Sequence, residues 1–145
     1  RKPWQTSMNK LLFYADFGHY KQVGQSITGL SYRAIRYGVV PRNYDKLFAE
    51  AVSQELIDVR YQEFENQATQ DRYIGQQYLP LSGASFNDKI FSETEITTLK
   101  RVVNLFNGKD TASIVRMNHE ESAWQKHVGG RQLVSYQYSF ELQHI

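Results

Sequence analysis

The chain has 145 residues, a length that suits one domain able to bury about 68–70% of the surface that its unfolded form exposes. Hydrophobic residues make up 41% and charged residues 22%, which argues against disorder. A net charge of +2 is too small for a nucleic-acid-binding surface over the whole molecule, and the absence of cysteine excludes disulfides and thiolate zinc sites. No apolar run approaches the roughly 18 residues of a membrane span, so we expect a cytoplasmic protein.

The first predicted element is a helix over residues 6–20, which Thr6 or Ser7 would cap and after which Gly24 would end the segment. Its apolar residues recur three and four positions apart, as on one face of a helix, and we interpret that face as core. The face comprises Trp4, Met8, Leu11, Leu12, Ala15 and His19. We expect Asp16 to accept hydrogen bonds from neighbouring groups rather than to act as an acid or base.

Glycine and proline punctuate the stretch that leads to the second helix. We predict a turn at Thr28-Gly29, an extended segment near residues 31–36 and a second turn at Tyr37-Gly38. Pro41 then stiffens the entry to the next helix. If the backbone at Gly38 needs a positive φ, the substitution Gly38→Val lowers the stability of the domain.

The middle of the chain predicts two helices that flank a β-hairpin. Asn43 is expected to cap a helix that ends near Gln54. Alternating residues near 57–61 and 73–78 indicate the two strands of the hairpin, with a polar segment between them. The next helix begins at a reciprocal capping pair and stops at a glycine. Its capping pair is Ser92 and Glu95, its stop is Gly108, and its predicted buried face comprises Ile96, Leu99, Val102, Val103 and Phe106.

The C-terminal part predicts a short helix that starts at Asp110 or Thr111, after which Asn118 and Glu121 repeat the capping pattern. Residues 134–142 alternate as a strand does but are also compatible with a helix, and periodicity alone favours the strand. Together these elements predict an α+β fold, a mainly helical single domain with a small antiparallel β-hairpin or sheet.

None of the motifs tested completes a catalytic, cofactor or metal site. His119-Glu120 starts like the helix of a zinc protease, but Ala123 stands where the second histidine is needed. Residues 24–29 have the glycine spacing of a phosphate loop, yet Leu30 replaces its lysine. We therefore predict no catalytic residue, no cofactor and no metal. The alternative is an enzyme whose pocket joins His119, Glu120 and Asp16.

A local basic cluster interleaved with tyrosines follows the first helix. It comprises Arg33, Arg36, Arg42 and Lys46, with Tyr32, Tyr37 and Tyr44 between them. Such a cluster is either a solvated rim paired with nearby acids or a surface that contacts a partner. As a partner we favour a protein over a nucleic acid.

Three segments of the chain resemble one known family. They are KLLFYADFGHY, ITGLSYRAIRYGVVP and HEESAW, and the sequence is identified from them as similar to the Panacea, or SocA-like, antitoxin domain from about Met8 onward. The residues that carry this signature are Asp16, Gly29, Gly38, Pro41, His119, Glu120 and Trp124. The chain departs from the family pattern where Val39 replaces a central proline, where Gln25-Ser26 replaces a common proline, and where Asn118 replaces a serine.

The resemblance implies a protein-binding antitoxin domain of a bacterial or phage toxin–antitoxin system, which neutralises a cognate toxin by direct binding. The expected partner-binding residues are Arg33, Arg36, Tyr37, Arg42 and Tyr44. The alternatives are a dimerisation or sensing domain of a transcriptional repressor, and a protease adaptor. We expect no membrane partner, a homo-oligomer as one option, and nucleic acid bound only through an N-terminal module that precedes Arg1. The family's ending also implies a helix from a cap at Ser135 through His144.

Overall fold

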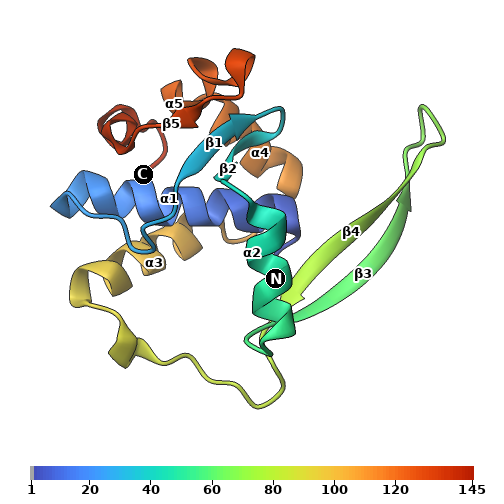
Figure 1. Cartoon of the computed structure of the whole chain (residues 1–145), viewed down its shortest axis with the longest axis horizontal. Coiled ribbons are helices and arrows are strands. Elements are labelled where there is room, and N and C mark those ends of the chain that lie inside the picture. Colours follow the sequence, from blue (N-terminus) through green and yellow to red (C-terminus); the bar gives the residue numbers. More distant parts are fainter. Residues whose placement is uncertain (1) are drawn as a thin grey trace.

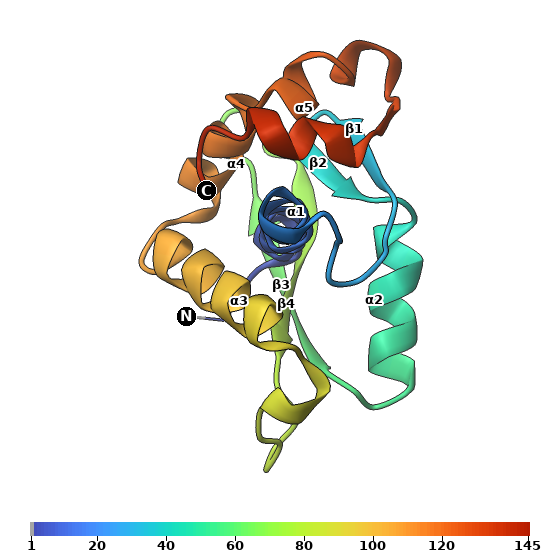
Figure 2. The same cartoon turned by 90° about the vertical axis from the view of Figure 1, so that its left-hand side faces the viewer.

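Helix α1 (Gln5–Val23) runs through the middle of the computed structural model, which describes residues 2–145. Figure 1 shows the other elements in chain order, and Figure 2 shows α1 nearly end-on with those elements around it. They are β1 (Tyr32–Ile35), β2 (Gly38–Pro41), α2 (Tyr44–Ser53), β3 (Asp58–Glu65), β4 (Arg72–Leu79), η1 (Asp88–Ile90), α3 (Glu93–Phe106), α4 (Thr111–His119), α5 (Ser122–Gln125), η2 (Val128–Gly130), β5 (Leu133–Val134) and η3 (Tyr136–Glu141), where η marks a 3-10 helix. The α+β prediction is confirmed.

Helix α1 is buried on nearly all sides rather than on one face. Phe13, Tyr14 and Phe17 are fully buried, although the predicted face excluded them. Four members of that face, Trp4, Met8, Leu11 and Leu12, are only half-buried. The periodicity predicted one buried face because it cannot show that a sheet and the C-terminal segment cover the opposite face of the helix. The expected cap is also wrong, since Trp4 occupies that position and the Ser7 hydroxyl lies 2.9 Å from that of Thr111.

A three-stranded antiparallel sheet in the order β2-β1-β5 covers one side of α1. Its hairpin pairs Tyr32 with Pro41 and Ala34 with Val39, and all four residues are buried. The connecting turn falls on Arg36 and Tyr37, one residue before the predicted position. Buried strands of four residues suffice here because α1 and the helices after it supply the packing that so short a hairpin lacks.

The second sheet is the predicted long hairpin β3-β4, which projects from the body of the domain (Figure 1). Two aromatic contacts anchor it. Near the base, Tyr78 of β4 is buried and stacks on Phe48 of α2 at 4.7 Å, and farther out Trp4 meets Phe64 of β3 edge-on at 5.3 Å. Tyr78 is the only buried residue in the two strands, so the hairpin depends largely on its own strand pairing.

Helix α3 begins as predicted and packs on α1, but its buried face is narrower than expected. The capping box of Ser92 and Glu95 is present, and Val102 and Phe106 are buried. Val103 was predicted to be buried, yet it is 64% exposed because no other element covers that side of the helix.

The C-terminal segment corrects two further predictions. Glu121, and not Asn118, occupies the N-cap position of α5, and Asn118 lies inside α4. Ser135 does cap a helix, since its hydroxyl accepts a hydrogen bond from the Gln137 N–H, but this helix is a 3-10 helix that ends at Glu141 rather than at His144. A two-residue strand, β5, precedes it. In residues 2–145, no helix is long and apolar enough to cross a membrane.

Candidate functional site

The carboxylate of Asp16 ties α1 to the loop that precedes β1. One oxygen accepts hydrogen bonds from the backbone N–H groups of Ile27 and Thr28, both at 2.8 Å. The other accepts the hydroxyl groups of Thr28 and Tyr32 at 2.5 Å. Asp16 is fully buried, and four donors offset the cost of burying its charge. This is the structural role predicted from the sequence.

Gly38 is the first residue of β2, and it lies against the buried side chain of Lys10. Its φ is +136°, and a Cβ atom at this position would overlap Cε of Lys10 and Oδ1 of Asn118. Lys10 is 1% exposed, and burial alone lowers its pKa to about 7. The hairpin approaches α1 this closely only because position 38 carries no side chain.

His119 and Trp124 contact the same hairpin next to its turn. The indole N–H of Trp124 donates to the carbonyl of Ile35 at 2.7 Å, and the His119 ring stacks on the indole at 3.8 Å between centroids. Burial lowers the pKa of His119, so the ring is neutral near pH 7, although a hydrogen bond to the Arg36 backbone opposes this shift. Both residues therefore pack against the strands that carry Gly38.

The model of one protein family, Antitoxin SocA-like, Panacea domain, matches residues 8–125. This chain belongs to that family. No curated protein and no solved structure gives a significant match. The matched range includes α1 from Met8 onward, both hairpins and the segment up to Gln125, so the contacts described above lie within the Panacea domain.

Two departures from the family pattern meet in space. The backbone N–H of Val39 donates to Oδ1 of Asn118 at 2.7 Å, and both residues are fully buried. A proline at position 39 has no N–H to satisfy, whereas valine leaves a donor on the edge strand of the sheet. Asn118 supplies the acceptor, so in this Panacea domain the second departure compensates for the first.

The remaining signature residues lie in the loop before β1, at the end of β2 and at the C-terminal end of α4. Gly29 adopts φ +74° in the loop held by Asp16, and Pro41 is buried opposite Tyr32. Glu120 is exposed and pairs with His144 at 3.3 Å. Its neighbour Glu121 is the buried carboxylate. Burial raises the pKa of Glu121, and the Gln143 N–H donates to both of its oxygens at 3.0 Å, which opposes that shift.

The five predicted partner-binding residues lie at different places on the short hairpin. Arg36 and Tyr37 form its tip, where the guanidinium lies 5.4 Å from the centre of the exposed tyrosine ring. Arg42 and Tyr44 lie at the other end, where β2 leads into α2. Arg33 sits between them on β1, opposite Val40. The structure thus brings only Arg36 and Tyr37 together directly.

Metal binding finds no support in the part of the chain that the structure describes. No group of three histidine, cysteine, aspartate or glutamate side chains lies close enough to hold an ion. His19 illustrates how the histidines are used, because one ring nitrogen contacts the Gln25 carbonyl at 2.6 Å and the other the Thr94 hydroxyl at 2.9 Å. It links α1 to α3.

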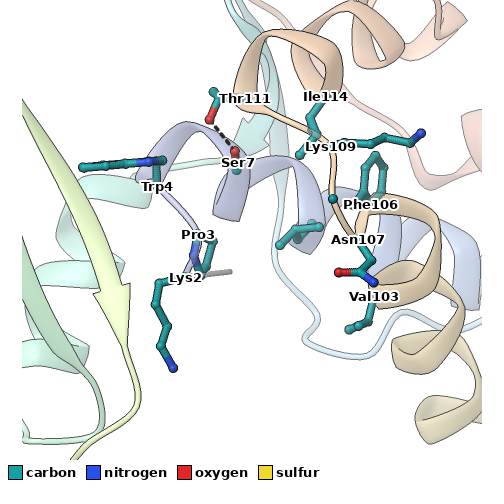
Figure 3. Close-up of a pocket in the computed structure, with 12 residues that line it drawn as sticks. Lys2, Pro3, Trp4, Ser7, Val103, Phe106, Asn107, Lys109, Thr111 and Ile114 are labelled. Atoms are coloured by element: carbon teal, nitrogen blue, oxygen red, sulfur yellow. Dashed lines mark hydrogen bonds between the residues drawn. The ribbon is translucent and has the colours of Figure 1, made fainter.

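Sequence reasoning missed an exposed apolar groove along α3. It lies between the N-terminal segment and α4 on one side, and beside Phe86 on the other. Figure 3 shows its first part, where Trp4, Val103 and Phe106 surround a common space. The only sequence signal was Val103 itself, which makes the apolar stripe of α3 wider than the part of it that is buried.

Proposed function

We propose that this Panacea domain is a stoichiometric protein binder that neutralises a cognate toxin in the bacterial cytoplasm, and not an enzyme. Membership of an antitoxin family suggests the toxin–antitoxin role. The proposal of direct binding is supported by the contacts that Asp16, Gly38 and Trp124 make. They are engaged in internal contacts, while Arg36 and Tyr37 at the turn of the short hairpin stay exposed.

The tip formed by Arg36 and Tyr37 has the chemistry of a protein-binding anchor. Tyrosine and arginine are enriched among the residues that contribute most to protein interfaces, because they combine a large apolar surface with hydrogen-bonding groups. The guanidinium already lies against the Tyr37 ring, so less side-chain freedom is lost on binding. The buried hairpin beneath holds both at a fixed position.

The residues that an enzyme would use have other partners. The two oxygens of Asp16 accept four hydrogen bonds, which leaves no free position for a proton transfer. The His119 ring is stacked on Trp124, and Glu120 is paired with His144 at the surface. These contacts support binding rather than catalysis as the activity of the domain.

Co-expression with the product of the adjacent gene tests the proposal. We expect the domain to restore growth when that product is toxic, and to co-purify with it in a fixed ratio. The double substitution Arg36→Ala with Tyr37→Ala should weaken the complex by about 30-fold or more, since even one anchor of this type contributes about 2 kcal/mol. Its melting temperature should stay close to that of the wild type.

The long hairpin supplies a matched control. Arg60 and Tyr61 repeat the same pair of residue types in β3, and Tyr61 is as exposed as Tyr37, at 63% and 55%. Changing both to alanine should leave toxin binding unchanged. Equal losses for the two double variants, or a loss only for Arg60 and Tyr61, would place the interface elsewhere and contradict the assignment to the tip.

A further inference from the structure

The groove along α3 is an exposed apolar surface of a size suited to side chains of a partner. Two adjoining cavities of about 290 and 490 Å³ share Val103, and we call them together the α3 groove. The first is drawn in Figure 3. Its walls are Trp4, Leu11, Val103, Phe106 and Ile114 in the first cavity, and Phe86, Ile96, Leu99 and Val103 in the second.

The charges at the α3 groove are basic. Lys2 lies at the edge of the first cavity and Lys100 at the edge of the second, and the residues that line the two cavities include no aspartate or glutamate. An apolar floor with lysines beside it favours an occupant that is apolar and acidic.

The β3-β4 hairpin presents such a surface. Its register places Tyr61, Glu63, Glu65, Arg72 and Ile74 on one face, because opposite residues of antiparallel strands point the same way. Tyr61 is 63% exposed and Ile74 is 67% exposed. The strand residues of this face include two glutamates against one arginine, since Arg72 lies opposite Glu65 and pairs with Glu63 at 3.2 Å. We call this face the arm face.

The α3 groove and the arm face cannot meet within one chain. Figure 1 shows the outer end of the hairpin pointing up and away from the body, whereas α3 lies below α1 and far from that end. A two-stranded hairpin that is exposed on this scale is marginally stable in water by itself. Both surfaces would be covered if two copies of the chain associated.

We propose that the arm face of one copy docks in the α3 groove of a second copy, and that the exchange is reciprocal. Tyr61 and Ile74 enter the cavities beside Val103, while Glu63 and Glu65 lie near Lys100 and Lys2 of the other copy. A reciprocal exchange obeys two-fold symmetry and closes at the dimer, whereas a one-way contact would continue into fibres. The dimer leaves the Arg36 and Tyr37 tip outside both surfaces.

Sedimentation velocity on the whole chain tests the proposal. Wild-type protein should be a dimer at about 100 μM, with an association that weakens as salt is added because the charges lie at the rim. The substitutions Val103→Glu, in the groove, and Ile74→Glu, on the arm, should each weaken dimerisation by about tenfold or more. Both sites are exposed, so melting temperature and circular dichroism should change little.

A mixture of the two variants separates arm exchange from other modes of association. In the mixed dimer, the arm of the Val103→Glu copy meets the intact groove of the Ile74→Glu copy, and the other contact carries both substitutions. A contact that one substitution has broken loses little more from the second, so the mixture should associate more tightly than either variant alone. Val23→Glu is the control, because Val23 is an exposed apolar residue outside both surfaces. Wild-type protein that stays monomeric, a mixture without gain, or an equal effect of Val23→Glu would overturn the proposal.

Discussion

The two β-hairpins of the chain are held in place in different ways. The short hairpin β1-β2 has four residues in each strand, and Tyr32, Ala34 and Val39 are buried. The long hairpin β3-β4 has eight residues in each strand, but only Tyr78 among them is buried. The hairpin with more internal hydrogen bonds is therefore the one with less tertiary support.

The difference shows where the family signature acts. Asp16, Lys10, Asn118 and Trp124 each contact the short hairpin or the loop that leads to it, so α1, α4 and α5 jointly fix its position. The long hairpin is supported by the Phe48–Tyr78 and Trp4–Phe64 aromatic pairs, and the exposed side chains of its strands are free to contact another molecule. Substitutions in the first region should change stability, and those in the second should change association.

The largest effect is expected from Gly38→Val. The new side chain would overlap Lys10 and Asn118, which are buried and have no space to move, at a φ of +136° that valine disfavours. We expect the free energy of unfolding to fall by about 4 kcal/mol or more, or the domain not to fold. Urea denaturation measures the change.

Gly75→Val is the matched substitution in the long hairpin. A Cβ atom there would lie 2.7 Å from Cε2 of Phe64, but this ring is half-buried and can turn, and the φ of Gly75 is not positive. The expected loss is about 1 kcal/mol. Similar losses at Gly38 and Gly75 would show that the two hairpins are equally constrained, contrary to the comparison.

A second effect concerns Lys10, whose pKa burial lowers from 10.5 to about 7. Between these values the unfolded chain holds a proton that the folded chain has lost, so the free energy of unfolding rises with pH. Burial lowers the pKa of His119 and raises that of Tyr14, so neither titrates between about pH 7.5 and 9.5. Over that interval we expect a rise of about 2.5 kcal/mol.

Lys10→Met should remove this rise and stabilise the domain most at the lower end of the interval, since folding then no longer requires this side chain to lose a proton. Denaturation curves at three pH values provide the measurement. Lys46→Met, at an exposed position of α2, should leave the pH dependence as in the wild type. A wild-type protein whose stability is flat over the interval would show that Lys10 reaches solvent in the folded state.

Asp16→Asn should lower the free energy of unfolding by about 2 kcal/mol. The amide oxygen can still accept from the N–H groups of Ile27 and Thr28. The amide NH₂ group, however, would face the hydroxyl groups of Thr28 and Tyr32, which donate to the carboxylate in the wild type. Asp58→Asn is the control in the long hairpin, where an exposed carboxylate contacts only the Val59 N–H in the neighbouring backbone. Its effect should stay within about 0.5 kcal/mol. Equal effects would contradict the assigned role of Asp16.

Much of the fold could be predicted because its signals are local. The capping box at Ser92, the alternation of the long hairpin and the glycine that ends α1 each depend on neighbours in the sequence. The family resemblance rested on the same local segments. It led to the correct expectation that Ser135 caps a helix, where periodicity alone favoured a strand.

The candidate site was harder to predict because it depends on contacts between distant segments. Nothing near Lys10 in the sequence indicates that an entire helix is surrounded by other elements. Asn118 resembles a helix cap, yet its partner Val39 lies 79 positions away. Val103 follows the buried stripe of α3 but faces the side that no element covers. A period identifies a face of a helix, and only the tertiary arrangement decides whether that face is covered.

The smallest effect on stability is expected at the tip of the short hairpin. Tyr37→Ala removes an exposed ring whose one ring contact is the Arg36 guanidinium, so the free energy of unfolding should change by about 0.5 kcal/mol or less. This result would show that the tip can bind a partner without stabilising the hairpin that carries it. Urea denaturation of Tyr37→Ala beside Trp124→Phe makes the distinction, since Trp124 supports the same hairpin from inside and should cost about 1–3 kcal/mol. A large loss for Tyr37→Ala would mean that the tip belongs to the scaffold, and weaker toxin binding by that variant would then reflect unfolding.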